Sequence, residues 1–215
     1  MPVSPQSRSF TLILAYLTGL GPLTIDVFIP SLPSMATHFA ASQSTVQLTI
    51  SAYLVGFSIA QIFHGPVSDR VGRKPMVLGA LAVYVVATLA CPAAPSIEVL
   101  IGLRVVQAAA AAGPIIIART MVRDVRSGVA AGQMLSVMAS IMGVLPVVAP
   151  ILGGILETRF GWRSSFFVTA GGGVLGFLMV WLALPETLGD RRAGPLSVGG
   201  ILRSFAVVAR NRVFQ

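Results

Sequence analysis

The chain has 215 residues, a formal net charge of +8, a hydrophobic fraction of 55% and only 10% charged residues. A soluble domain carries about 25% charged residues, so this composition excludes an ordinary soluble fold and indicates a polytopic membrane protein. It also excludes a soluble nucleic-acid-binding protein, because a basic excess in a membrane protein is expected in the loops beside the bilayer.

Six apolar runs predict six membrane spans, since one span needs about 20 mostly apolar residues. The expected spans cover residues 10–31, 44–65, 75–93, 97–119, 130–156 and 162–184. Residues 1–185 are therefore predicted to form an all-α bundle of six transmembrane helices. The basic stretch 186–215, interrupted by Gly and Pro, is predicted to be a cytoplasmic linker. Glu186, at the end of the last span, is expected to be solvated.

The positions of the positive charges predict the orientation in the membrane. Twelve of the 15 Lys and Arg residues fall before the first span, in alternate loops or after the last span, all on the same side. Only Arg159 and Arg163 fall on the opposite side, and Arg104 lies within a span. The positive-inside rule then places the N-terminus in the cytoplasm.

Several kinds of chemistry have no support in the sequence. A single cysteine, Cys91, excludes an intrachain disulfide and a thiolate metal cluster. Neither His38 nor His64 has a metal-ligand partner at a useful spacing. No nucleophile–base set and no Walker-type phosphate loop is present. We therefore expect a protein that is not an enzyme and that binds no metal and no cofactor.

Two ionisable residues lie well inside the expected spans, Asp26 in the first and Arg104 in the fourth. Each costs at least about 2.5–3.5 kcal/mol at the centre of a helix in a membrane, so each should face the protein interior or a wet cavity. Both lie about 7–10 Å below the same boundary. They form either a structural ion pair or a titratable carboxylate beside a fixed cation, which would couple transport to protons. Gln107, on the face of Arg104, belongs to this site or bonds a neighbouring helix.

A dense charged segment joins the second and third expected spans and is predicted to form a turn. Residues 65–74 read Gly-Pro-Val-Ser-Asp-Arg-Val-Gly-Arg-Lys. This string resembles the G-x-x-x-D-R-x-G-R-K signature of the major facilitator superfamily at every fixed position. The resemblance implies one six-helix half of a twelve-span transporter. It also implies a gating motif formed by Gly65, Asp69, Arg70, Gly72, Arg73, Lys74 and the acid at the inner end of the fourth helix, Asp124. The basic residues are also expected to hold the loop inside, and we expect both roles to apply together.

Other segments resemble narrower groups of that superfamily. Arg104 and Gln107 match the fourth-helix motif R-x-x-Q-G, with Ala108 in place of the glycine. The fifth span resembles the G-P-x-x-G-G motif of drug/proton antiporters, with Ala149 in place of the first glycine; its residues are Pro146, Pro150, Gly153 and Gly154. The pattern I-D-x-x-x-P-x-x-P over residues 25–33 is similar to the Bcr/CflA branch, named for bicyclomycin and chloramphenicol resistance.

These resemblances imply the N-terminal half of a multidrug exporter in a bacterial-type inner membrane. Its expected partners are a small-molecule drug, protons, the lipid bilayer and a C-terminal six-helix half, and its expected energy source is the proton gradient. Two alternatives stay open: an uptake carrier for a small organic solute, and a membrane fragment that does not transport. The fifth-span motif favours export over uptake.

Overall fold

The computed structural model describes residues 2–189, which form six helices long and apolar enough to cross a membrane and contain no strand. The elements are α1 (Arg8–Asp26), a 3-10 turn (Ile29–Ser31), α2 (Leu32–His38), α3 (Gln43–Val71), α4 (Arg73–Ala90), a 3-10 turn (Cys91–Ala93), α5 (Ile97–Val125), α6 (Gly128–Phe160) and α7 (Arg163–Ala183). The all-α prediction of six transmembrane helices is confirmed. From residue 190 onward, the predicted linker lies outside the described residues.

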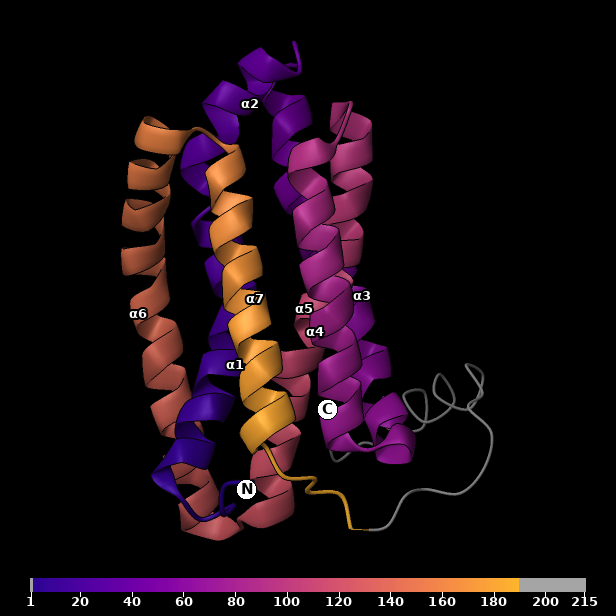
Figure 1. Cartoon of the computed structure of the whole chain (residues 1–215), viewed down its shortest axis with the longest axis vertical. Helices are drawn as coiled ribbons and strands as arrows, with labels where there is room; N and C mark the ends of the chain where they lie inside the picture. Colours follow the sequence, from indigo (N-terminus) through magenta and orange to yellow (C-terminus); the bar gives the residue numbers. More distant parts are fainter. Residues whose placement is uncertain (1, 190–215) are drawn as a thin grey trace, which may run out of the picture.

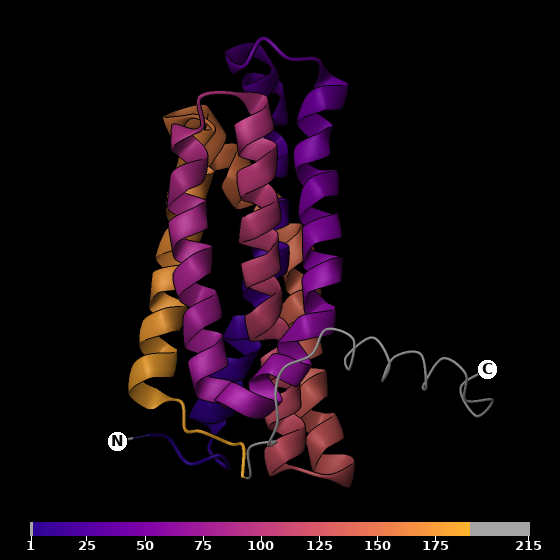
Figure 2. The same cartoon turned by 90° about the vertical axis from the view of Figure 1, so that its right-hand side faces the viewer.

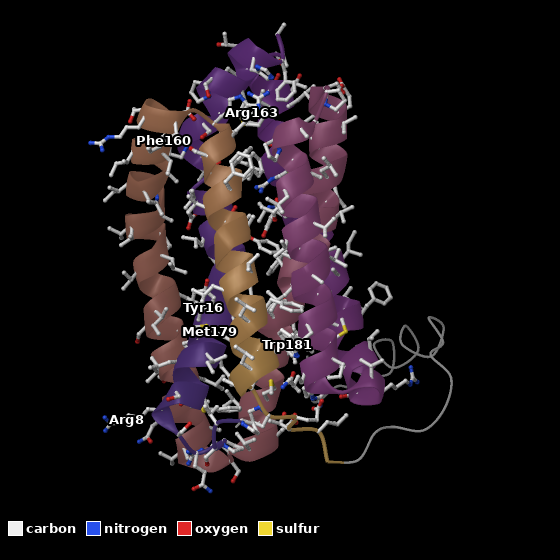
Figure 3. All side chains as sticks on the ribbon, viewed as in Figure 1. Arg8, Tyr16, Phe160, Arg163, Met179 and Trp181 are labelled. Carbon is white, nitrogen blue, oxygen red and sulfur yellow. The ribbon has the colours of Figure 1, made fainter. Side chains whose placement is uncertain are left out.

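The helices stand side by side in a bundle (Figure 1). α5 packs mainly against α3 and α4, α1 packs against α6, and α4 packs against α7. The short α2 lies at the upper end of the bundle, beside the upper end of α3 in the view of Figure 2. α3 and α6 are the least buried of the six spans. Arg8 and Trp181 lie toward the lower end of the bundle and Phe160 and Arg163 lie at its upper end (Figure 3).

The first span is interrupted directly after Asp26, earlier than the expected boundary at residue 31. Proline has no N–H, and its ring would collide with the carbonyl four residues before it. For Pro30 that residue is Asp26, the last residue of α1, so the proline disfavours a further turn here, although α5 and α6 continue through Pro114 and Pro146. The chain makes a turn at Val27 and Phe28, whose N–H groups donate to the carbonyls of Leu23 and Ile25, and continues into the first 3-10 turn. We call residues 26–28 the junction.

The charged segment 65–74 is helical over most of its length, which differs from the expected turn. α3 continues to Val71, α4 begins at Arg73, and Gly72 alone separates them. A helix of 29 residues is about 44 Å long, whereas the hydrocarbon core is about 30 Å thick. The last turns of α3 therefore extend beyond the apolar layer, where charged residues can stay helical. α5, which also has 29 residues, carries Asp124 in its last turn for the same reason.

Candidate functional site

Arg104 on α5 is fully buried and has few polar partners. Its exposed fraction is 0%. Its Nη1 donates to Gln107 Oε1 at 2.7 Å, whereas Nε and Nη2 have no hydrogen-bond partner among residues 2–189. Two aromatic rings contact the guanidinium instead: its Cζ lies 4.4 Å from the ring centroids of both Phe28 and Tyr53. We call these two rings the aromatic clamp.

A buried polar network extends from Arg104 across three helices. Gln107 Nε2 donates to Thr88 Oγ1 of α4 at 2.8 Å, so this amide bonds both Arg104 and a neighbouring helix. Tyr84, one turn before Thr88 on α4, bonds Thr24 of α1 through the two hydroxyls at 2.6 Å. A buried network of this kind fixes the relative positions of its members because an unmade bond would be costly there. The network thus ties α4 and α5 to the end of α1 that carries Asp26.

Asp26 and Arg104 do not form an ion pair among residues 2–189, where the ion pairs are those of Arg73. The Asp26 side chain is half-buried at the last residue of α1 and accepts none of the described hydrogen bonds. Its link to Arg104 runs through the chain: Phe28, two residues later, belongs to the aromatic clamp. The structural ion pair that the sequence left open is therefore not formed in this conformation.

The fifth-span motif also meets the junction, through Gly153 of α6. Gly153 of α6 is buried against Val27, and a Cβ placed on it would collide with the Val27 carbonyl oxygen. A Cβ on the neighbouring Gly154 would meet nothing within 4 Å. Ala149 is fully buried in the same small apolar cluster as Val27. Of the predicted motif, Gly153 is the residue that touches the junction, while Pro146 is exposed.

Three of the predicted gating residues, Asp69, Arg73 and Asp124, form a compact cluster at the ends of α3, α4 and α5. Arg73 is 5% exposed. Its Nη1 donates to Asp69 Oδ1 at 2.6 Å and to Ser68 Oγ at 2.5 Å, and its Nε donates to Asp124 Oδ2 at 2.9 Å. One buried cation thus joins two carboxylates from different helices. We call Ser68, Asp69, Arg73 and Asp124 the gate cluster.

Glu186 is exposed, as expected, and its carboxylate also binds the start of α4 beside the gate cluster. Its carboxylate accepts the N–H groups of Arg73 at 2.9 Å and of Lys74 at 3.2 Å. A carboxylate at a helix N-terminus satisfies donors that have no partner within the helix and is attracted by the helix dipole. Gly72 makes room for this carboxylate, because a Cβ on residue 72 would lie 2.6 Å from Glu186 Oε2. Gly72 also has a φ of +107°, which residues with a side chain rarely adopt.

The remaining predicted residues are peripheral to these contacts. Gly65 accepts a bond from the Ser68 hydroxyl and has open space around it. Arg70 Nε and Nη1 are buried and have no hydrogen-bond partner within the described part of the chain. Lys74 Nζ donates to the Trp181 carbonyl at 2.9 Å. Sequence reasoning missed Glu186 and the aromatic clamp; for Glu186 the one available signal was its position next to Pro185, where the last span ends.

Comparisons with known proteins give the family. A family model described as Major Facilitator Superfamily matches residues 14–214. The chain is 35% identical over 216 residues to an uncharacterized MFS-type transporter, YdgK, of Bacillus subtilis, covering 100% of this chain and 54% of that protein. It is 34% identical over 184 residues to a chloramphenicol resistance protein of Pseudomonas aeruginosa, covering 85% and 44%. It is 32% identical over 184 residues to multidrug resistance protein D of Escherichia coli, covering 85% and 46%.

Solved structures share the fold at lower identity. The proton:xylose symporter XylE aligns with a TM-score of 0.74 at 15% identity, covering 94% of this chain and 51% of that chain. The human organic anion transporter MFSD10 aligns with a TM-score of 0.71 at 19% identity, covering 96% and 57%. The chain spans about half the length of the curated relatives that it matches. It is a multi-pass membrane protein that belongs to the Major Facilitator Superfamily, a family of transporters and not of enzymes.

Proposed function

We propose that the chain is the N-terminal half of a proton-coupled multidrug exporter in a bacterial-type inner membrane, with its N-terminus in the cytoplasm. The names of the chloramphenicol and multidrug resistance relatives support drug export, and the charge bias supports the orientation. The observation that carries the proposal is the meeting of Asp26, Arg104 and Gly153 around one junction. Residues from three motifs that are far apart in the sequence thereby belong to or contact the same short segment, residues 26–28.

Asp26 is the proposed proton carrier. Its carboxylate is half-buried and lacks an ion-pair partner among residues 2–189, so taking up a proton breaks no existing bond. Arg104 keeps a fixed positive charge nearby with two unbonded nitrogens. An ionised Asp26 is attracted to this charge and a protonated Asp26 is not, so each protonation state favours a different position of the junction. A ligand or proton shifts a conformational equilibrium only through such a difference.

The gate cluster is the proposed cytoplasmic latch. Arg73 joins the ends of α3, α4 and α5 through its two carboxylates. In alternating access, two helix bundles rock against each other around a central site, and a latch at one end would favour one of the two states. Asp69→Asn removes one of the charges that Arg73 binds. Unchanged expression together with unchanged transport in this variant would contradict the latch.

A second six-helix half is the proposed structural partner. Most span residues of α3 and α6 are not buried by the other residues that the structure describes, and the relatives are about twice as long as the part that aligns. A central cavity would then lie between the two halves, with α1 and α5 supplying Asp26 and Arg104. The drug itself would be a small and largely apolar molecule, as expected for a binding site in a membrane bundle.

The deciding experiment measures drug accumulation in cells that express the gene, with and without an uncoupler of the proton gradient. We expect an energy-dependent fall in accumulated drug that the uncoupler abolishes. Asp26→Asn should abolish uphill export at unchanged membrane levels. Arg104→Ala should be inactive and Arg104→Lys partly active at best, because lysine lacks the planar guanidinium. Energy-dependent accumulation would favour an uptake carrier, and no effect in either direction would favour a fragment that does not transport.

A further inference from the structure

Arg104 presents a physical problem, because an unpaired charge is expensive to bury. Its exposed fraction is 0%, and no carboxylate among residues 2–189 lies within ion-pair distance of it. Buried charges normally pair with an opposite charge or satisfy all their hydrogen bonds. Here one nitrogen, Nη1, bonds Gln107, and both Nε and Nη2 lack an acceptor. Something other than a counter-ion must hold this guanidinium in place.

The two rings of the aromatic clamp are the groups that contact it. A guanidinium within about 6 Å of a ring centroid is attracted by the negative face of the ring, most strongly when water is absent. Both clamp centroids lie at 4.4 Å, and both ring residues are buried. The rings attract the charge without accepting a hydrogen bond from Nε or Nη2. The clamp thus stabilises the cation and leaves two of its nitrogens available.

Each ring is itself fixed by a contact with another element. The Tyr53 hydroxyl donates to the Gly21 carbonyl of α1 at 3.3 Å, which ties α3 to α1. The Phe28 ring makes an edge contact with Phe166 of α7 at 5.4 Å between centroids. Phe28 also belongs to the junction. Its neighbour in the junction, Val27, touches Gly153. A displacement of the junction therefore moves one wall of the clamp.

We propose that Phe28 and Tyr53 are positioning residues for Arg104, and that Phe28 transmits movement of the Asp26 junction to this guanidinium. The clamp replaces a permanent counter-ion, so that Nε and Nη2 stay free to bind a carboxylate when the junction moves. The transmission to a coupling site rests on the proposed function, whereas the positioning of Arg104 does not. A chemical measurement on this chain can therefore test the positioning by itself.

The test is the reactivity of Arg104 toward phenylglyoxal, mapped by mass spectrometry on the purified chain in detergent. Arg123, which is exposed, is the internal standard for a reactive arginine, and Arg73 is the standard for a buried one. Arg104 should be protected in the wild type. In Phe28→Leu, which keeps an apolar side chain but removes the ring, its modification rate relative to Arg123 should rise about 30-fold, the factor that corresponds to one desolvated cation–π contact. Phe28→Tyr should restore protection.

Phe166→Leu is the matched control, because it removes a ring that contacts Phe28 but not Arg104. Its Arg104 should be modified far more slowly than that of Phe28→Leu, because Phe28 loses one supporting contact but keeps the ring that covers the guanidinium. Equal protection in Phe28→Leu and the wild type would overturn the proposal, and so would an equal rise in Phe166→Leu. Tyr53→Leu repeats the test from α3, and protection of Arg73 reports which variants are folded. Unchanged protection of Arg104 in either folded clamp variant counts against the clamp.

Export in cells separates this inference from the function on which it partly rests. Phe28→Leu should lose coupled export and Phe28→Tyr should retain it, in parallel with the protection of Arg104. If export by the wild type does not respond to the uncoupler, the proton-coupled function fails while the protection data still decide the positioning. If Phe28→Leu deprotects Arg104 but exports as the wild type does, the transmission through Phe28 is refuted.

Discussion

Gly153 and Gly154 offer a sharp test of the junction, because the same substitution at adjacent residues should have opposite effects. A Cβ on Gly153 would overlap the Val27 carbonyl oxygen and lie 2.9 Å from its carbonyl carbon and 3.1 Å from its Cα. These are backbone atoms of the turn that follows α1, so they cannot rotate away as the end of a side chain would. A Cβ on Gly154 would meet nothing within 4 Å.

The magnitude follows from two opposing terms. Overpacking by one methyl group against a fixed neighbour costs about 1–3 kcal/mol. Replacing glycine by alanine in a helix interior gains about 1 kcal/mol. Gly153→Ala should therefore lower the free energy of unfolding by up to about 2 kcal/mol. Gly154→Ala should raise it by up to about 1 kcal/mol, since only the helix propensity changes.

Thermal unfolding in detergent, followed by tryptophan fluorescence, measures the difference. A change of 1 kcal/mol shifts the midpoint by about 2–4 °C in a chain of this length. We expect Gly153→Ala to melt several degrees below Gly154→Ala, with the wild type between them. Equal midpoints for the two variants, or a higher midpoint for Gly153→Ala, would refute the close contact between α6 and the Val27 carbonyl.

Three further substitutions test the other contacts. Gly72→Ala should lower the free energy of unfolding by more than about 1 kcal/mol, because it combines a left-handed φ with a collision with Glu186; chemical denaturation should show a larger loss than for Glu186→Gln, which keeps the shape of the cap. Tyr84→Phe removes the hydroxyl that bonds Thr24, while Thr24 keeps its bond to the Leu20 carbonyl, so the midpoint of thermal unfolding should fall by an amount equivalent to about 0.5–1.5 kcal/mol. Arg73→Lys removes the planar fork that reaches two carboxylates, so a limited trypsin digest should cut the ends of α3 and α5 faster than in the wild type; an unchanged digestion pattern would contradict the bridging role.

The sequence alone was sufficient for the six spans and for the family. Long apolar runs are decisive in a membrane because backbone polar groups there must bond within their own segment, which makes each run a helix. The motif over residues 65–74 identified the superfamily because its fixed positions are close together in the chain. Composition and local motifs do not depend on how the helices pack. Both the spans and the family could therefore be predicted from the sequence.

The helix ends were only partly predictable from the sequence. Pro30 disfavours the helix at Asp26 through a local clash with the carbonyl of that residue, but the same rule would also have placed breaks before Pro114 and Pro146, through which α5 and α6 continue. The charged segment after Gly65 looked like a turn because hydropathy falls there. It remains helical because α3 extends past the apolar layer, and hydropathy marks the membrane boundary rather than the end of a helix.

The tertiary structure decided which residues meet. Arg73 and Glu186 are 113 residues apart in the chain, and no periodicity within one helix indicates that a carboxylate after α7 binds the start of α4. Likewise, the choice between an ion pair and an unpaired cation at Arg104 depended on where the Phe28 and Tyr53 rings lie. Such contacts depend on how separate helices pack. Side chains from several helices compete for the same buried space, and the sequence of one helix does not show which side chain occupies it.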